Sequence, residues 1–250
     1  MLLNIIPALF SQCHPDFING NDAYKNGNFA EAADFYEKVI DENFEDAFVY
    51  YNLGNAYFKS NNIAHALLAY ERAHFLNPRD KDIKNNLLYA RLFSTDKIAS
   101  IYSDNLLGEF WDIIRLITYK ETIIATIALS LIAAVFLFIY IVTIRGKSRR
   151  IMLNLSISFW ILTLFFLAIF VTKMNDTWFL KTAIVMSPSV DVSSSPTEGG
   201  EHLFTLHSGT RVAVLDNYGT SSRIILEDGR RDGWVPSNGI ERVIANVKPE

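Results

Sequence analysis

Residues 122–172 read TIIATIALSLIAAVFLFIYIVTI, then RGKSRR, then IMLNLSISFWILTLFFLAIFVT, and this stretch organises the rest of the chain. Neither of its two apolar segments, 122–144 and 151–172, contains a charged residue. A helix needs about 20 residues to cross the hydrocarbon core of a bilayer. The sequence therefore predicts a membrane hairpin, with transmembrane helices at 121–144 and 151–173 and a short loop at 145–150.

The short loop of this hairpin carries four cations and no anion. Positively charged loops stay in the cytoplasm, so we expect the chain before and after the hairpin to lie on the opposite side of the membrane. Transporters and proton relays place ionisable groups at membrane depth, and neither apolar segment has one. We therefore expect the hairpin to be an anchor in the lipid bilayer and an assembly surface.

Composition sets limits on the remainder of the chain. Its 250 residues carry a formal net charge of −4, whereas a nucleic-acid partner would require a basic face, so we expect no such partner. The single cysteine cannot form an internal disulfide.

Residues 1–12 are mostly apolar and resemble the hydrophobic part of a secretory signal. The alternative is that they form a frayed first turn of the next domain.

A repeat with a period of 34 residues follows this segment. Four pairs of positions separated by that period share their character: Gly20 and Gly54, Gly27 and Asn61, Ala32 and Ala66, Tyr36 and Tyr70. The period and the pattern of small and aromatic residues resemble the tetratricopeptide repeat. Apolar residues at helical spacing in 82–93 predict a capping helix, because two repeats alone would leave an apolar face open. We expect an all-α repeat domain at 13–96.

Asparagines recur at matching points on the first helices of these repeats. Asn21 and Asn55 form one pair of equivalent positions, and Asn52 and Asn86 form another. An asparagine amide can pair with both the N–H and the C=O of an extended peptide. We predict that these four residues bind a peptide and that Lys59 adds a contact to an acidic side chain. The alternative is that the asparagines cap turns or face water.

Residues 104–120 separate apolar from polar side chains at helical spacing. The apolar side carries Leu106, Leu107, Phe110, Trp111, Ile113, Ile114 and Ile117. This pattern is typical of an amphipathic helix that lies on the bilayer surface or packs on a partner helix. The alternative is a fourth helix of the repeat domain.

After residue 179 the sequence changes to short β-prone runs separated by turn residues. The strand candidates are 182–186, 203–206, 211–215, 224–226 and 233–235, and Asp228-Gly229 is a hairpin signal. We expect about five or six strands in a small all-β barrel at 179–247.

Several pieces of this segment resemble bacterial SH3 domains. They are Val190-Asp191-Val192, Ser195-Pro196, residues 206–210, and Gly233-Trp234-Val235-Pro236. The resemblance implies an SH3-like barrel that binds either a peptide or peptidoglycan. Many such domains carry an aromatic residue on the ligand side after the position of Val214, where this chain has Thr220-Ser221-Ser222-Arg223.

Patterns typical of catalysis are missing from the sequence. It contains no Ser-His-Asp order, phosphate-binding loop or dinucleotide fingerprint. His65 and His74 would lie on different faces of one helix, and His202 and His207 have no cysteine partner, so we expect neither pair to bind a metal. We expect no catalytic residue and no cofactor, and we predict that the protein is not an enzyme.

The order of the parts is repeats, then a two-span hairpin, then an SH3-like domain. This order resembles the BatE-like proteins of the Bat aerotolerance family. The resemblance implies an inner-membrane protein with both terminal domains in the periplasm. It also implies a role in tolerance of oxidative stress or of envelope stress. It implies as partners other Bat proteins with von Willebrand A domains or repeats, and a MoxR-type ATPase. We expect a non-enzymatic scaffold for membrane or periplasmic proteins; the alternative is a module that binds or senses the cell wall through its SH3-like domain.

Overall fold

The structure is a computed structural model that describes residues 14–42, 46–98, 114, 117, 119–143, 146–175, 182–197 and 199–244. The chain divides into two compact units. The first unit joins Met1–Asp104 with Thr177–Glu250, and the second unit is Asn105–Asp176. The expected signal-like segment at 1–12 and most of the amphipathic helix expected at 104–120 lie outside the described residues.

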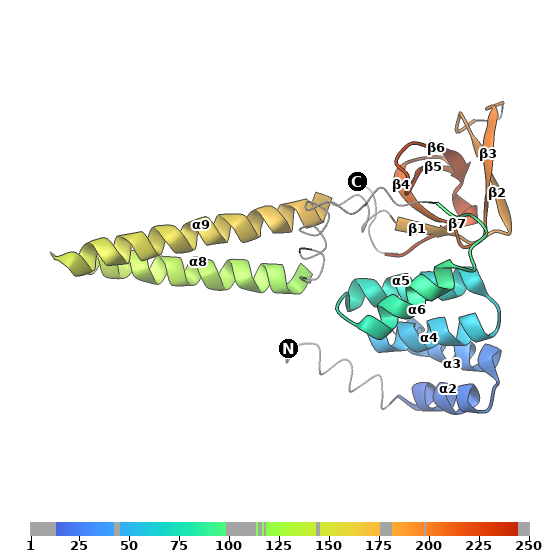
Figure 1. Ribbon diagram of the computed structural model, residues 1–250, viewed down its shortest axis with the longest axis horizontal. Helices are drawn as coiled ribbons and strands as arrows, with labels where there is room; N and C mark the ends of the chain where they lie inside the picture. Colours follow the sequence, from blue (N-terminus) through green and yellow to red (C-terminus); the bar gives the residue numbers. More distant parts are fainter. Residues whose placement is uncertain are drawn as a thin grey trace. The chain divides into compact units, whose positions relative to one another are not determined.

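The described part of the N-terminal region is helical (Figure 1). Its helices are α2 (Pro15–Lys25), α3 (Phe29–Asp41), α4 (Ala47–Lys59), α5 (Ile63–Leu76) and α6 (Lys81–Arg91). The side chains of His14, Asp46 and Asp80 accept hydrogen bonds from backbone N–H groups at the starts of α2, α4 and α6. Such caps give partners to donors that the helix itself leaves unpaired. The turns before α3 and α5 use positive φ at Gly27 (82°) and Asn61 (64°), as their equivalence in the repeat predicts.

A tyrosine ring covers a glycine in each helix pair. A Cβ atom on Gly20 would lie 2.7 Å from Cε1 of Tyr36, and one on Gly54 would lie 2.6 Å from Cδ1 of Tyr70. Both rings are almost completely buried. Since no side chain fits at such distances, only glycine allows the two helices of a pair to approach this closely.

The equivalent position in α6 is occupied by Leu88, whose side chain is 49% exposed. Ile83, Leu87 and Ala90 of α6 are buried, and Leu87 and Ala90 pack against α5 of the second repeat. Leu88 and Leu92 also recur at the apolar spacing that predicted this helix, but both are exposed. The reason is that the part of α6 that packs on the second repeat covers only some of the apolar side chains on that face of the helix.

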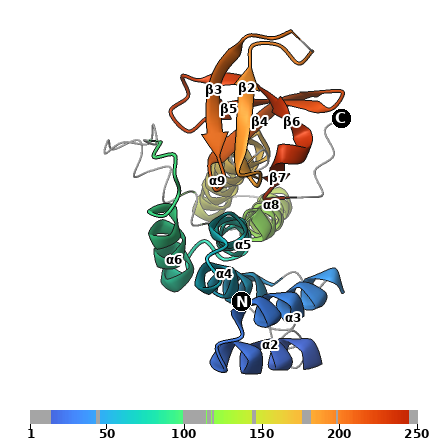
Figure 2. The ribbon, with the colours of Figure 1, turned by 90° about the vertical axis from the view of Figure 1, so that its right-hand side faces the viewer.

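Residues 182–244 form an antiparallel sheet of seven strands among the described residues (Figure 2). The strands are β1 (Thr182–Val185), β2 (Ser189–Ser193), β3 (His202–His207), β4 (Arg211–Tyr218), β5 (Ser221–Leu226), β6 (Asp232–Pro236) and β7 (Ile240–Arg242). Their order in the sheet is β3-β2-β6-β5-β4-β1-β7. The Asp228-Gly229 hairpin signal is confirmed, because Gly229 joins β5 to β6 with a φ of 61°.

The sequence analysis did not propose β2 and β7 as strands. In β2 only Val190 and Val192 point into the core, between exposed polar residues, and β7 is three residues long. Strands this short or polar give a weak local signal.

Strand β1 is buried along its whole length. Ala183 and Val185 belong to the apolar core of the sheet, whereas Ile184 packs in a separate cluster with Ala64 and Leu68 of α5. The outer face of β1 is therefore covered by the repeat helix α5, within the first unit.

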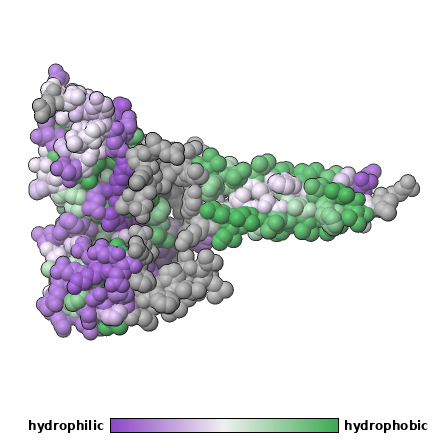
Figure 3. Space-filling view, turned by 180° about the vertical axis from the view of Figure 1, so that it is seen from behind, coloured by the Kyte–Doolittle hydropathy of each residue, from purple (hydrophilic) through white to green (hydrophobic). Residues whose placement is uncertain are grey.

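The second unit contains α8 (Tyr119–Val142) and α9 (Lys147–Asn175). Glu121–Val142 and Lys147–Val171 have mean hydropathies of 2.7 and 2.2, and both helices are long and apolar enough to cross a membrane. Apolar residues dominate their visible surface (Figure 3). Ser156 Oγ donates a hydrogen bond to the carbonyl oxygen of Ala133 at 3.0 Å, which joins the two helices. Since α9 begins at Lys147, residues 147–150 of the expected loop form its first turn.

Substituting the glycine under the second tyrosine tests the packing of the repeats. Gly54→Ala should lower the free energy of unfolding by about 1–3 kcal/mol, because its methyl group would collide with the buried ring of Tyr70. Chemical unfolding of the full chain in detergent, followed by circular dichroism, measures this loss. The matched control is Leu88→Ala, which should cost less than about 0.5 kcal/mol because the side chain is exposed. Equal losses in the two variants would contradict this account of the packing.

Candidate functional site

The predicted peptide-binding residues all lie on the first helices of the repeats or on the capping helix. Asn21 is on α2, Asn52, Asn55 and Lys59 are on α4, and Asn86 is on α6. The four asparagines are half-buried, and Lys59 is exposed at the end of its helix. Helical folding thus places these residues on three neighbouring elements of one domain.

Two of the asparagines bind the tyrosines that cover the glycines. Tyr36 Oη donates a hydrogen bond to Asn21 Oδ1 at 2.8 Å, and Tyr70 Oη donates one to Asn55 Oδ1 at 2.7 Å. Each asparagine directly follows the glycine of its repeat, so the same helix turn packs under the ring and receives its hydroxyl. This pairing was not foreseen from the sequence, although both residue types recur with the 34-residue period.

Asn86 connects the capping helix to the second repeat. Its Nδ2 donates hydrogen bonds to Asn55 Oδ1 at 2.9 Å and to Tyr51 Oη at 3.1 Å. The structure therefore brings the side chains of Asn55 and Asn86 together. Among the described residues, the side chains of Asn52 and Lys59 make no hydrogen bond.

Burial keeps these tyrosine hydroxyls protonated. It raises the pKa of Tyr36 to about 12, with a smaller contribution from Tyr24. Burial likewise raises the pKa of Tyr70, again with contributions from neighbouring tyrosines. A hydroxyl that stays protonated remains a donor, so it holds the oxygen of its asparagine amide as an acceptor.

These bonds decide what the amides can offer to a ligand. Asn55 Oδ1 accepts hydrogen bonds from both Tyr70 and Asn86, so its two lone pairs are engaged and its amide nitrogen is the group left to bind a peptide carbonyl. Asn21 Oδ1 accepts one hydrogen bond, from Tyr36, and keeps a second lone pair. The chemistry at Asn55 is thus narrower than the two-way pairing that the sequence suggested.

Exposed aromatic residues border the same helices, and the sequence analysis missed them. Phe58 of α4, Tyr89 of α6 and Phe93 form a cluster in which ring centroids lie 5.3 to 5.6 Å apart. Tyr89 and Phe93 are 54% and 52% exposed. The repeat period could have indicated this cluster, because Tyr89 lies 34 residues after Asn55 and so occupies the equivalent position on α6. An apolar ligand side chain would find contact area here.

One group of described residues has the composition of a metal site: His14, Asp16 and Glu42. Both ring nitrogens of His14 are already engaged. Nδ1 accepts a hydrogen bond from the backbone N–H of Asp16 at 3.2 Å, and Nε2 lies 2.9 Å from Oε2 of Glu42. These contacts explain why the three residues lie together: His14 caps the start of α2 and is held there by Glu42.

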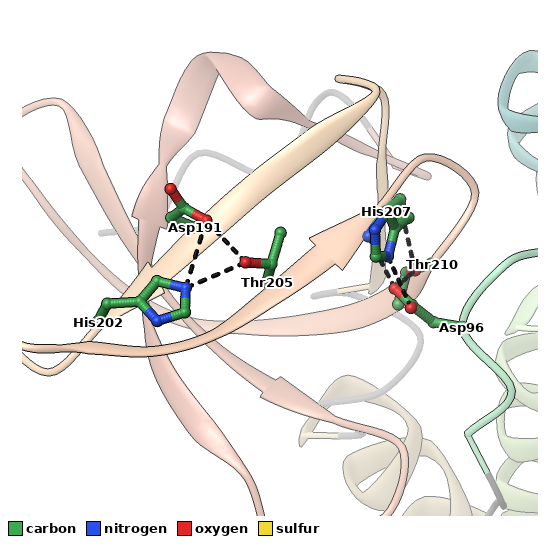
Figure 4. A network of polar contacts seen from close by, with 6 residues as sticks. All are labelled: Asp96, Asp191, His202, Thr205, His207 and Thr210. Carbon is green, nitrogen blue, oxygen red and sulfur yellow. Dashed lines mark hydrogen bonds and ion pairs between the residues drawn. The ribbon is translucent and has the colours of Figure 1, made fainter.

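The other histidines lie in separate places. His65 bonds to Asn62, and His74 is largely buried, which lowers its pKa. Figure 4 shows His202 beside Asp191 and Thr205, while His207 contacts Asp96 and lies apart from that group. His202 and His207 thus belong to two separate polar groups of the sheet.

The sheet presents a second aromatic group, a pair formed by the exposed Tyr218 and the half-buried Trp234. Tyr218 at the end of β4 is 62% exposed, and its ring meets that of Trp234 in β6 edge-on at a centroid distance of 6.5 Å. Arg223, the register partner of Trp234 in β5, forms an ion pair with Asp232 at 2.7 Å. The SH3 resemblance implies an aromatic residue near 220–223, whereas the exposed aromatic residue of this part of the sheet is Tyr218, two residues earlier. The pairing of β4 with β5 shifts its register between Val214 and Asp216, so counting residues from Val214 does not locate the aromatic side chain.

Comparison with known families identifies one part of the chain. The tetratricopeptide repeat matches residues 47–80, which contain α4 and α5. The predicted second repeat is therefore confirmed. Such repeats are typically non-catalytic modules that bind other proteins, and no enzymatic family is indicated. No curated protein matches the chain.

The asparagine bonds predict different effects of two neighbouring substitutions. Asn55→Ala should lower the free energy of unfolding by about 1–3 kcal/mol, because Tyr70 and Asn86 both lose a partner. Asn52→Ala, one turn earlier on α4, should cost less than about 0.5 kcal/mol. Chemical unfolding of both variants measures the difference. A loss for Asn52→Ala as large as that for Asn55→Ala would show that the hydrogen-bond network does not stabilise the repeats.

Proposed function

We propose that this protein is a membrane-anchored, non-enzymatic scaffold that binds an extended segment of a partner protein on the first helices of its repeats. The confirmed repeat at 47–80 carries the proposal, because such repeats bind other proteins. The binding residues are Asn21, Asn52, Asn55, Lys59 and Asn86, with Phe58, Tyr89 and Phe93 beside them.

The chemistry of this surface suits a backbone more than a specific charge. The amide nitrogens of Asn21, Asn52 and Asn55 would donate to peptide carbonyls, whereas Asn86 Nδ2 already donates to Asn55 and Tyr51. The aromatic cluster would hold an apolar side chain, and Lys59 would meet an acidic one. Asn52 and Lys59 carry the part of this surface that does not stabilise the repeats themselves. They are therefore the residues whose loss separates binding from folding.

The anchor in this proposal is the pair α8 and α9. Their length and hydropathy support membrane insertion, and the cations at Lys147, Arg149 and Arg150 favour a cytoplasmic position for their connection. A second observation supports an even number of crossings. Glu71 of α5 pairs with Arg211 of β4 at 3.1 Å, and segments from before and after the hairpin belong to one compact unit, which is what we expect if both are on the same side of the membrane.

The resemblance to BatE-like proteins suggests the setting. In this proposal the repeats and the SH3-like sheet face the periplasm from a bacterial inner membrane, and the partners include proteins with von Willebrand A domains. A role in tolerance of oxygen or envelope stress comes from this resemblance alone.

A second candidate function is recognition of the cell wall by the sheet. Tyr218 and Trp234 support it, because exposed aromatic faces beside a hydrogen-bonding arginine and aspartate suit a sugar or peptide ligand. This surface lies at the position where the SH3 resemblance implies a ligand. The same full chain can be tested for both functions.

Membrane topology is tested with reporters. A reporter placed after Lys147 should be active only in the cytoplasm, and reporters after Thr95 and Lys248 only on the opposite side, because the linker cations hold the hairpin in that orientation. Activity assays with paired cytoplasmic and periplasmic reporters measure this. A cytoplasmic signal at Lys248 would refute the hairpin.

Binding is tested by substituting the two residues that do not stabilise the repeats. Asn52→Ala combined with Lys59→Ala should reduce partners recovered with the full chain from native membranes roughly tenfold, which corresponds to about 1.4 kcal/mol of lost contacts. The melting temperature should not change. The matched control is Arg230→Ala, an exposed cation on the β5–β6 turn.

Unchanged recovery of the same partners would exclude the repeat surface as the docking site. A parallel assay with purified peptidoglycan sacculi addresses the second candidate function. Binding of the parent chain that is lost in Tyr218→Ala would favour cell-wall recognition, and absence of binding by the parent chain would exclude it.

A further inference from the structure

The contact between α5 and the sheet contains a buried carboxylate. The side chain of Glu71 is 7% exposed, although glutamate is usually on the surface. Its Oε1 lies 2.5 Å from Nη2 of Arg91 on α6 and 3.1 Å from Nε of Arg211 on β4. Arg211 also pairs with Glu227. Charged groups from α5, α6 and the sheet thus converge on one oxygen.

The two arginines keep Glu71 ionised. Burial alone would raise the pKa of its carboxyl group, but Arg211 and Arg91 outweigh burial and lower the pKa to about 2. The carboxylate is therefore charged at every physiological pH. A buried charge of this kind is tolerated only while its partners stay in place.

Further contacts on either side of Glu71 tie the same surfaces together. Arg72 donates hydrogen bonds to the carbonyl oxygens of Val243 (3.1 Å) and Arg242 (3.2 Å), and it pairs with Glu241 at 2.8 Å. These three residues belong to β7 or follow it directly. One side chain of α5 thus holds the end of the last strand.

Asp96, just beyond α6, makes the third attachment (Figure 4). Its Oδ2 accepts hydrogen bonds from the backbone N–H of His207 at 2.7 Å and from Oγ1 of Thr210 at 2.6 Å. Its Oδ1 lies 2.9 Å from Nδ1 of His207. Burial opposes the charged form of Asp96, yet these hydrogen bonds from Thr210 and His207 lower its pKa.

Gly209 completes the fit between the two surfaces. A Cβ atom at this position would lie 3.2 Å from Cδ1 of Leu67 on α5, and the backbone has a φ of 87°. The β3–β4 turn therefore lies directly against the helix. Apolar contact of Ile184 with Ala64 and Leu68 fills the space between the charged attachments.

We propose that the Glu71–Arg91–Arg211 cluster is a charge latch that makes the repeat helices and the sheet one cooperative folding unit. Removing an arginine would leave the buried Glu71 carboxylate short of a partner, and removing the Glu71 charge would take away the group that joins Arg91 of α6 to Arg211 of β4. Either change disfavours the assembled state. The two parts of the first unit then depend on each other for stability and are not independent modules. This inference does not depend on which ligand the protein binds.

The test follows hydrogen exchange of the full chain in detergent across a urea series. In the parent chain, peptides from α5 and peptides from β1 and β4 should lose protection at the same urea concentration, because they open together. Glu71→Gln should separate the two midpoints by at least about 0.5 M urea. Arg72→Gln, which leaves the buried cluster intact, should separate them by a smaller amount.

The matched control is Arg231→Gln, which removes an ion pair with Asp228 that is local to one turn of the sheet. It should leave the midpoints coincident. Separate midpoints in the parent chain would overturn the proposal. So would coincident midpoints in Glu71→Gln. If Glu71→Gln fails to fold, Arg91→Gln, which removes one cation of the same cluster, decides between the two outcomes.

Discussion

The stacking of Tyr70 over Gly54 is the contact on which the repeat domain depends. It sets the distance between α4 and α5, since any side chain at Gly54 would meet the ring. It also points the tyrosine hydroxyl at Asn55, which in turn holds Asn86 of the capping helix. One packing contact therefore fixes both the core and the orientation of the amides on the candidate binding surface. The pair Gly20 and Tyr36 repeats the arrangement with Asn21.

Helix α5 contributes to three hydrophobic clusters. Ala69 and Ala73 pack in the core of the earlier repeat helices, Ala66, Leu67 and Tyr70 pack with α6, and Ala64 and Leu68 pack with β1. Such a helix cannot show a simple apolar stripe with a polar back, because nearly every side meets protein. Its charged residues then need partners on a neighbouring element, and Glu71 finds Arg91 and Arg211.

Features that arise from local chemistry could be predicted from the sequence. The repeat period located the turns at Gly27 and Asn61, and Asp228-Gly229 located a hairpin. The apolar segments predicted two long helices, although α9 begins at Lys147 and not at 151, because the cationic residues continue the helix. The bonds of Asn55 and the position of Tyr218 could not be predicted in this way. The bonds of Asn55 depend on which helix packs against its amide, and the position of Tyr218 depends on a register shift in β4. The spacing of residues within a single helix or strand predicts neither.

The cover that α5 gives to β1 has a consequence for how the chain is made. The repeat helices form through contacts between neighbours in sequence, which favours early and rapid folding. Strand β1 follows both apolar helices in the chain, so it is synthesised long after α5, the helix that covers its outer face. A nascent chain would therefore carry repeat helices whose β1-facing side, at Ala64 and Leu68, stays uncovered until the sheet has been synthesised. By the same reasoning, a recombinant C-terminal fragment would expose Ile184 and Val243 to solvent and would be prone to aggregate.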